Sequence, residues 1–162
     1  MITAAVERRV CEAVQRAVDA VPGLARRPVV RGAWQLAASA ARGPTLKPTG
    51  SELRVSVSSP DYSAFSHCRA QMACSIEMVF RNASEAAAAA TVLDIANAVE
   101  MLLARWQTCR EALKQDLDAG GFHPTAAKLT GGEAPYMEGD DWTASLTFTT
   151  TGVITTPNHK HE

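Results

Sequence analysis

The stretch MACSIEMVFRNASEAAAAATVLDIANAVEMLLARW, residues 72–106, changes its hydrophobic period partway along. Up to Phe80 apolar residues alternate with polar ones, a pattern typical of a strand that buries one face. After Asn82, which precedes Glu85 by three residues as in a capping box, apolar residues recur at helical spacing. Such a stripe must pack on a flat surface, so we expect the helix to cover the sheet. The predicted buried residues are Met72, Cys74, Ile76, Met78 and Phe80 in the strand, and Val92, Ile95, Val99, Leu102 or Leu103, and Trp106 in the helix.

Similar patterns flank this stretch. An amphipathic helix is predicted over residues 2–21, because apolar residues recur there at steps of three and four before a Pro-Gly stop. A second, short helix is predicted in TCREALKQDLDAGG, residues 108–121, where Gly120–Gly121 end it. Strands are predicted at residues 51–59 and 122–131, and within the final stretch DDWTASLTFTTTGVITTP, residues 140–157.

The remaining segments are predicted to be irregular. Residues 22–50 hold four of the eight prolines, although RPVVRGAW within them is compatible with a short strand and AWQLAASAAR with a short helix. GEAPYMEGDD, residues 132–141, is interpreted as an acidic loop, and residues 156–162 are expected to fray. The order of elements predicts one α+β domain over residues 1–155, with an antiparallel or mixed sheet of about four strands and helices packed on one face.

The final strand carries almost no reactive group. Its alternation places Trp142, Ala144, Leu146 and Phe148 toward the core. The opposite face then consists of small hydroxyl side chains, and two interpretations of it stay open. It is either an exposed face built for β propensity, or an association surface that a partner can approach closely. The residues of this face are Thr143, Ser145, Thr147 and Thr149.

Charge is unevenly distributed along a chain whose net charge is only −1. Residues 1–50 contain eight basic and three acidic residues, whereas the rest contain eight basic and fourteen acidic residues. The difference indicates either two solvated faces or a head-to-tail contact between copies. For the second case, the residues predicted to meet across the contact are Arg26, Arg27 and Arg31 of one copy and Glu138, Asp140 and Asp141 of its neighbour.

Motifs for catalysis or cofactor binding are weak. His67, Cys68 and Cys74 do not complete a zinc ligand set, and no cofactor is expected. A thiol hydrolase that uses Cys68 with His67 or His123 remains an alternative, because sequence does not place these side chains relative to one another. The near-neutral charge predicts no nucleic-acid readout. The absence of a signal peptide and of a long apolar span predicts a cytosolic protein with reduced thiols and no membrane partner.

The order of elements resembles the phage tail terminator family, which includes tail-completion proteins of Mu-like phages. The resemblance covers residues 52–155, and residues 2–21 more loosely. It is carried by the amphipathic helix AAVERRVCEAVQRAV, the strand and helix SIEMVFRNASEAAAAATVLDIANAVEMLL, the short helix REALKQDLDAGG, and the final acidic loop and strand EGDDWTASLTFTTTGVI. The longer, more basic residues 22–50 depart from the family pattern.

This resemblance implies a structural protein of the virion tail, assembled in the bacterial cytoplasm. Members form a ring, expected here to be a hexamer, which binds the last ring of the tail tube protein and ends its polymerisation. The other face of the ring is presented to the head completion or connector protein. A different head–tail joining or tail assembly protein is the second interpretation. Neither interpretation implies catalysis or a cofactor.

Overall fold

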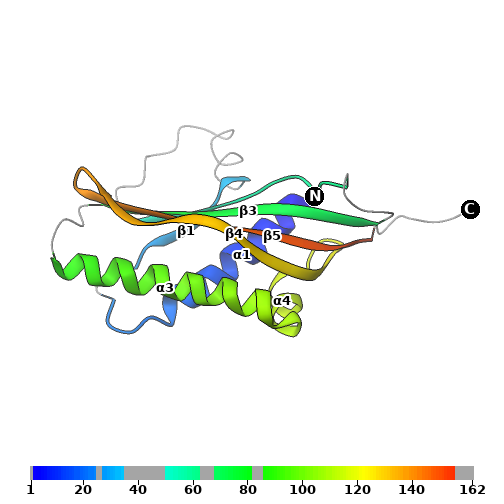
Figure 1. Ribbon diagram of the computed structural model, residues 1–162, viewed down its shortest axis with the longest axis horizontal. Coiled ribbons are helices and arrows are strands. Elements are labelled where there is room, and N and C mark those ends of the chain that lie inside the picture. Colours follow the sequence, from blue (N-terminus) through cyan, green and yellow to red (C-terminus); the bar gives the residue numbers. More distant parts are fainter. Residues whose placement is uncertain (1, 25–26, 35–49, 63–67, 82–85, 156–162) are drawn as a thin grey trace, which may run out of the picture.

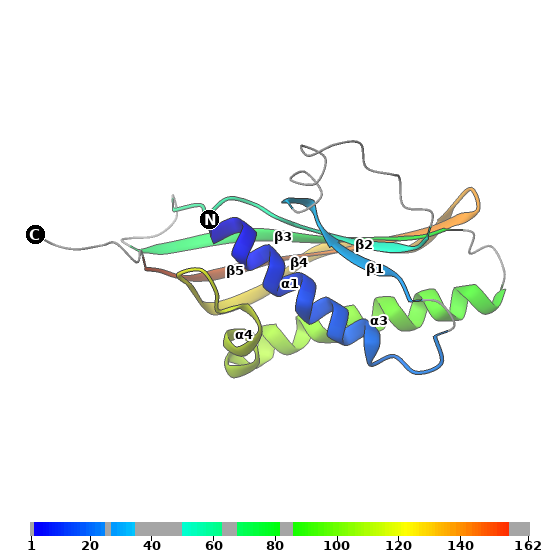
Figure 2. The ribbon, with the colours of Figure 1, turned by 180° about the vertical axis from the view of Figure 1, so that it is seen from behind.

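The computed structural model describes residues 2–24, 27–34, 50–62, 68–81 and 86–155. Within these ranges the protein forms a five-stranded sheet, and helices cover one of its faces (Figures 1 and 2). The helices are α1 (Ile2–Asp19), α3 (Ala86–Thr108) and α4 (Arg110–Leu117); the strands are β1 (Val29–Gly32), β2 (Glu52–Val57), β3 (Arg69–Phe80), β4 (Phe122–Glu138) and β5 (Asp141–Ile154). The predicted α+β class is therefore confirmed.

The strands lie in the order β1-β2-β3-β5-β4. β1 pairs in parallel with β2, whereas the other neighbours are antiparallel, so the sheet is mixed. The described sheet has one strand more than the predicted number, because RPVVRGAW does pair, as the short outer strand β1. The predicted capping box at Asn82–Glu85, residues 35–49 with all but the first two residues of the suggested helix AWQLAASAAR, and the predicted frayed tail lie outside the described residues.

The predicted acidic loop at 132–141 is wrong, because β4 continues to Glu138 and pairs with β5 along its length. Register shifts at three places let this glycine- and proline-containing segment stay paired. Gly132 has φ +152°, and an added Cβ there would overlap the backbone oxygen of Ser145. Glycine thus permits the close approach of β4 to β5, which the local sequence alone does not reveal.

The core lies between the helices and the sheet. All of the predicted buried residues of β3 and α3 are at most 3% exposed, with Leu103 rather than Leu102 as the fully buried member of its pair. α3 runs lengthwise beneath the sheet (Figure 1). The rings of its Trp106 and of Phe148 in β5 lie 5.4 Å apart between centroids. The prediction that the 92–106 stripe packs on the sheet is confirmed.

α1 crosses the same face obliquely, under β1 and β2 (Figure 2). Its valines at positions 6, 10, 14 and 18 are fully buried. Asp116 of α4 fixes the far side of this helix layer, because its carboxylate accepts hydrogen bonds from Trp106 Nε1 at 2.7 Å and Arg16 at 3.1 Å. None of the described helices is long and apolar enough to cross a membrane.

Candidate assembly surface

The face of the sheet opposite the helices, called here the open face, carries polar and small side chains. The predicted hydroxyl residues Thr143, Thr147 and Thr149 do lie on it, but each is half-buried rather than fully exposed. Flanking strands cause this partial burial, because β5 lies between β3 and β4. The predicted orientation is confirmed, and a role in association stays a prediction.

One row of the open face crosses the whole described sheet. It runs through Arg31 in β1, Arg54 in β2, Glu77 in β3, Ser145 in β5 and Glu133 in β4. The row is basic at the β1 side and acidic at the β4 side. Strand order produces this arrangement, since β1 and β4 are the outer strands and belong to the basic and acidic parts of the chain.

A buried carboxylate partly neutralises the basic end of this row. Glu52 is only 1% exposed, and its Oε1 accepts hydrogen bonds from the guanidinium groups of Arg54 and Arg81. Its Oε2 is buried and has no hydrogen-bond partner among the described residues. Because Glu52 engages Arg54, the cation of this row that is left without an ion pair among the described residues is Arg31.

The β1 edge is defined here by Arg27, Val29, Arg31 and Trp34. Arg27 is exposed and binds the carboxylate of Asp19 and the carbonyl of Val18, both at 3.4 Å. Val29 and Trp34 are each 48% exposed. Arg26, which was predicted to belong to this contact, lies outside the described residues.

The β4 edge is defined here by Glu133, Tyr136, Met137, Glu138 and Asp140. All five residues are exposed, and the two large apolar side chains are 44% and 42% exposed. Asp141 follows the turn and begins β5. A groove of about 310 Å³ runs from this edge onto the open face, between Glu77, Glu133 and Glu138. The Thr143 hydroxyl in its lining is buried and has no hydrogen-bond partner within the described ranges.

Strand order places the β1 and β4 edges on opposite sides of the described sheet, so the predicted basic and acidic partners do not meet within one copy. Contact between them in neighbouring copies stays a prediction. The reasoning from sequence missed Arg54, Glu77 and Glu133 as members of the charged row. The alternation in residues 51–59 and 72–81 puts Arg54 and Glu77 opposite the apolar side chains of their strands, but it does not say which strands are neighbours.

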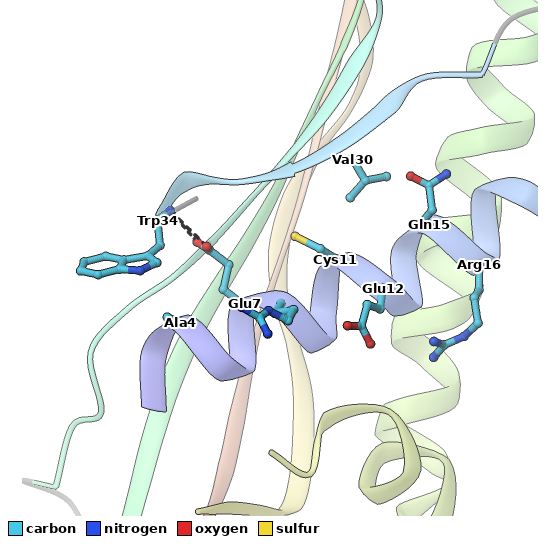
Figure 3. A pocket seen from close by; sticks show the side chains of 9 residues that line it. Ala4, Glu7, Cys11, Glu12, Gln15, Arg16, Val30 and Trp34 are labelled. Carbon is cyan, nitrogen blue, oxygen red and sulfur yellow. Dashed lines mark hydrogen bonds between the residues drawn. The ribbon is translucent and has the colours of Figure 1, made fainter. Parts of the chain in front are cut away.

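A second groove, of about 810 Å³, lies between α1 and β1 (Figure 3). Glu7 stands at its base and is 4% exposed; both carboxylate oxygens accept the backbone N–H of Trp34, at 3.0 and 3.1 Å. Gly32 leaves room for this carboxylate, since an added Cβ would overlap it. In Figure 3 the Trp34 indole lies at one end of the groove and points away from Cys11. Burial, reinforced by Glu7 and Glu12, raises the pKa of Cys11 to about 12, so this thiol is not an activated nucleophile.

The residues of the alternative thiol site do not form a nucleophile–base pair in the described structure. His67 lies outside the described residues, and Cys68 is exposed at the start of β3. The ring of His123 instead contacts Asp118 and Thr155, each at 3.0 Å. Burial, then the charge of Glu7, raises the pKa of Cys74 to about 12. No group of three or more possible metal ligands occurs in the part of the chain that the structure describes.

Comparisons with known proteins give a likeness of fold. No protein-family model matches the chain, and no curated protein matches it either. A chain in the solved structure "Virion of native gene transfer agent (GTA) particle" is similar to it, with a TM-score of 0.55 and 17% sequence identity. The similarity covers 94% of this chain and 97% of that chain. The protein therefore shares its fold, nearly end to end, with a component of that virion.

Proposed function

We propose that the protein is a structural component of a phage or prophage virion, acting as a tail terminator. Its copies assemble head to tail into a ring, a hexamer by the family resemblance, which caps the tail tube. The ring ends polymerisation of the tube protein and presents a face to the head completion or connector protein. It acts in the virion tail, after assembly in the bacterial cytoplasm, and needs no catalysis or cofactor.

The observation that carries this proposal is the placement of opposite charges at opposite edges of the described sheet. A contact between two unlike patches is heterologous, so each copy keeps one patch available for the next. Such a contact builds a closed ring when the rotation between copies divides a full turn, and an open filament otherwise. The shared fold supports the proposal from a separate direction, because the similar chain belongs to a virion.

Oligomeric mass tests the self-assembly. Size-exclusion chromatography with light scattering, at low and at physiological salt, should give a discrete mass that is a small multiple of 17.3 kDa. Charged contacts weaken as ionic strength rises, so the assembly should weaken in high salt. The proposed ring would be refuted by a protein that stays monomeric at high concentration both alone and in the presence of purified tail tubes.

The terminator role needs a second measurement. Tail tube protein polymerised with this protein should give tubes of limited length, each with a cap at one end by electron microscopy. Binding to the head connector without any effect on tube length would instead identify a head–tail joining protein. The two outcomes separate a terminator from other virion assembly roles.

A further inference from the structure

We propose that Trp34 of one copy inserts into a groove between α3 and β4 of the next copy, with Arg27 and Arg31 placed against acidic residues at the groove rim. The inference rests on the proposed self-assembly and names the side chain that anchors it. It differs from a purely charged contact, because the β1 and β4 edges each expose large apolar side chains as well as charge.

The anchor is an exposed aromatic side chain on a fixed backbone. Trp34 lies two residues beyond Gly32, the last residue of β1, and is 48% exposed, so much of its indole is available to a partner. Its backbone N–H is held by the buried Glu7 carboxylate, which in turn belongs to α1. Tryptophan is enriched among the residues that dominate binding energy, and a fixed backbone lowers the entropy lost on binding.

The receiving groove lies at the other edge and has a volume of about 430 Å³. Its walls are mainly apolar, with Ala96 of α3 on one side and Leu129 and Pro135 of β4 on the other. Gly131 and Gly132 leave the β4 side without side chains at the point where the strand changes register. The groove can therefore receive a flat aromatic side chain from a neighbouring copy.

Charge favours a second copy as the occupant. Glu100 of α3 and Glu133 of β4 line the groove and are exposed, and neither is in an ion pair among the described residues. Trp34 is accompanied by Arg31, which also lacks an ion pair there, and by Arg27. The β1 edge thus presents an aromatic side chain together with cations, and the groove presents apolar walls together with carboxylates. Since the two sites are on opposite edges of the described sheet, one copy does not fill its own groove.

Removal of the anchor tests the proposal. Trp34→Ala should weaken assembly at least tenfold, as light scattering over a dilution series measures, while far-UV circular dichroism stays native. Tyr62→Ala is the matched control, because Tyr62 is 50% exposed but belongs to neither edge. Equal assembly of the Trp34 and Tyr62 variants overturns this inference and leaves the proposed ring standing. A wild-type protein that never assembles overturns both.

Charge exchange tests the orientation of the contact. Arg31→Glu and Glu133→Arg should each weaken assembly, and the double variant should recover most of the affinity at low salt. The recovery is specific to residues that face each other. A double variant as weak as the two single variants combined contradicts this pairing.

Crosslinking provides an independent measurement that does not depend on removing the anchor. Ala33→Cys and Ala134→Cys are placed together in a Cys68→Ser, Cys109→Ser background, since both of those native thiols are exposed. Oxidation should give a ladder of covalent oligomers from the double variant. A mixture of the two single variants should stop at dimers, because each copy then carries one reactive edge. An assembled protein that gives no crosslink in either case contradicts the inference.

Discussion

The two faces of the sheet are made by the same strands but carry different side chains. Toward the helices β3 presents side chains that are all at most 3% exposed, and in the same core Trp106 of α3 packs on Phe148 of β5. On the open face the alternate positions carry hydroxyls and charges, and no described helix covers them. Burial of the core therefore depends on one face, whereas the other face and the edges contribute little to it. Substitutions on the helix-covered face should therefore lower the free energy of unfolding more than matched substitutions on the open face or at the edges.

The largest expected difference is between two tryptophans. Trp106→Ala should lower the free energy of unfolding by about 3–5 kcal/mol, because a fully buried aromatic leaves a cavity. Trp34→Ala removes the same side chain from the β1 edge, where it is half exposed, and should cost less than about 1 kcal/mol in the dissociated protein. Urea unfolding of both variants measures the difference. Similar losses would mean that the β1 edge is part of the folding core.

A smaller effect is expected for the polar contact within the helix layer. Asp116→Ala should cost about 1–3 kcal/mol, because the buried indole N–H of Trp106 loses its acceptor. Asp94→Ala, on the exposed side of α3, is the matched control and should stay within about 0.5 kcal/mol. Thermal unfolding followed by circular dichroism compares them. If the two aspartates behaved alike, Asp116 would not be a structural acceptor.

The helix-covered face should also show a pH dependence through Cys74. Its folded pKa is about 12 against an ordinary value of 9.0, so the folded thiol keeps a proton that the unfolded chain loses. The contribution of the protonated Cys74 thiol to the free energy of unfolding is fully present below pH 9. It falls as pH rises from 9 toward 12, by about 1.4 kcal/mol per pH unit.

Denaturant unfolding at pH 8 and pH 10 checks this slope in wild type and in Cys74→Ala. The variant lacks the buried thiol and should lose less stability between the two pH values. A variant as pH-sensitive as the wild type would assign the dependence to other groups, such as Cys11.

The smallest expected difference is between two adjacent threonines of β5. Thr150 is fully buried on the helix-covered face, and its hydroxyl donates to the Ala126 carbonyl at 3.1 Å. Thr150→Val should cost about 1 kcal/mol, because that acceptor loses its donor. Thr149→Val, on the open face, should stay within about 0.5 kcal/mol. Differential scanning calorimetry resolves the pair, and the reverse order would mean that the faces are assigned wrongly.

Much of the fold could be predicted because its signals are local. The alternation of β3 and the helical spacing of α3 follow from which side chains must leave water, so the buried residues were identified in advance. The acidic loop was misjudged for the opposite reason. Glycine and proline favour turns locally, yet pairing with β5 keeps the segment 132–138 in a strand through bulges. Tertiary pairing thus overrode local propensity.

The candidate surface was predicted only in part. Sequence indicated which threonines face outward and which end of the chain is basic. It did not identify the contact between Trp34 and Glu7 at one edge, or the groove at Gly131 and Gly132 at the other. These features form only through contacts between segments that are far apart in sequence. The hydrogen bonds between Glu7 and Trp34, which are 27 positions apart, are an example.

By itself the sequence determined the kinds of element, the buried face of each, and the division of the chain into a basic and an acidic part. These properties follow from hydrophobic period and composition, and both can be read from residues that are close together in the sequence. The tertiary structure alone decided that β1 and β4 are outer strands and that the opposite charges stand on opposite edges. The physical reason is that strand order depends on which long-range pairings bury the core best, and the period of a single strand does not contain that information.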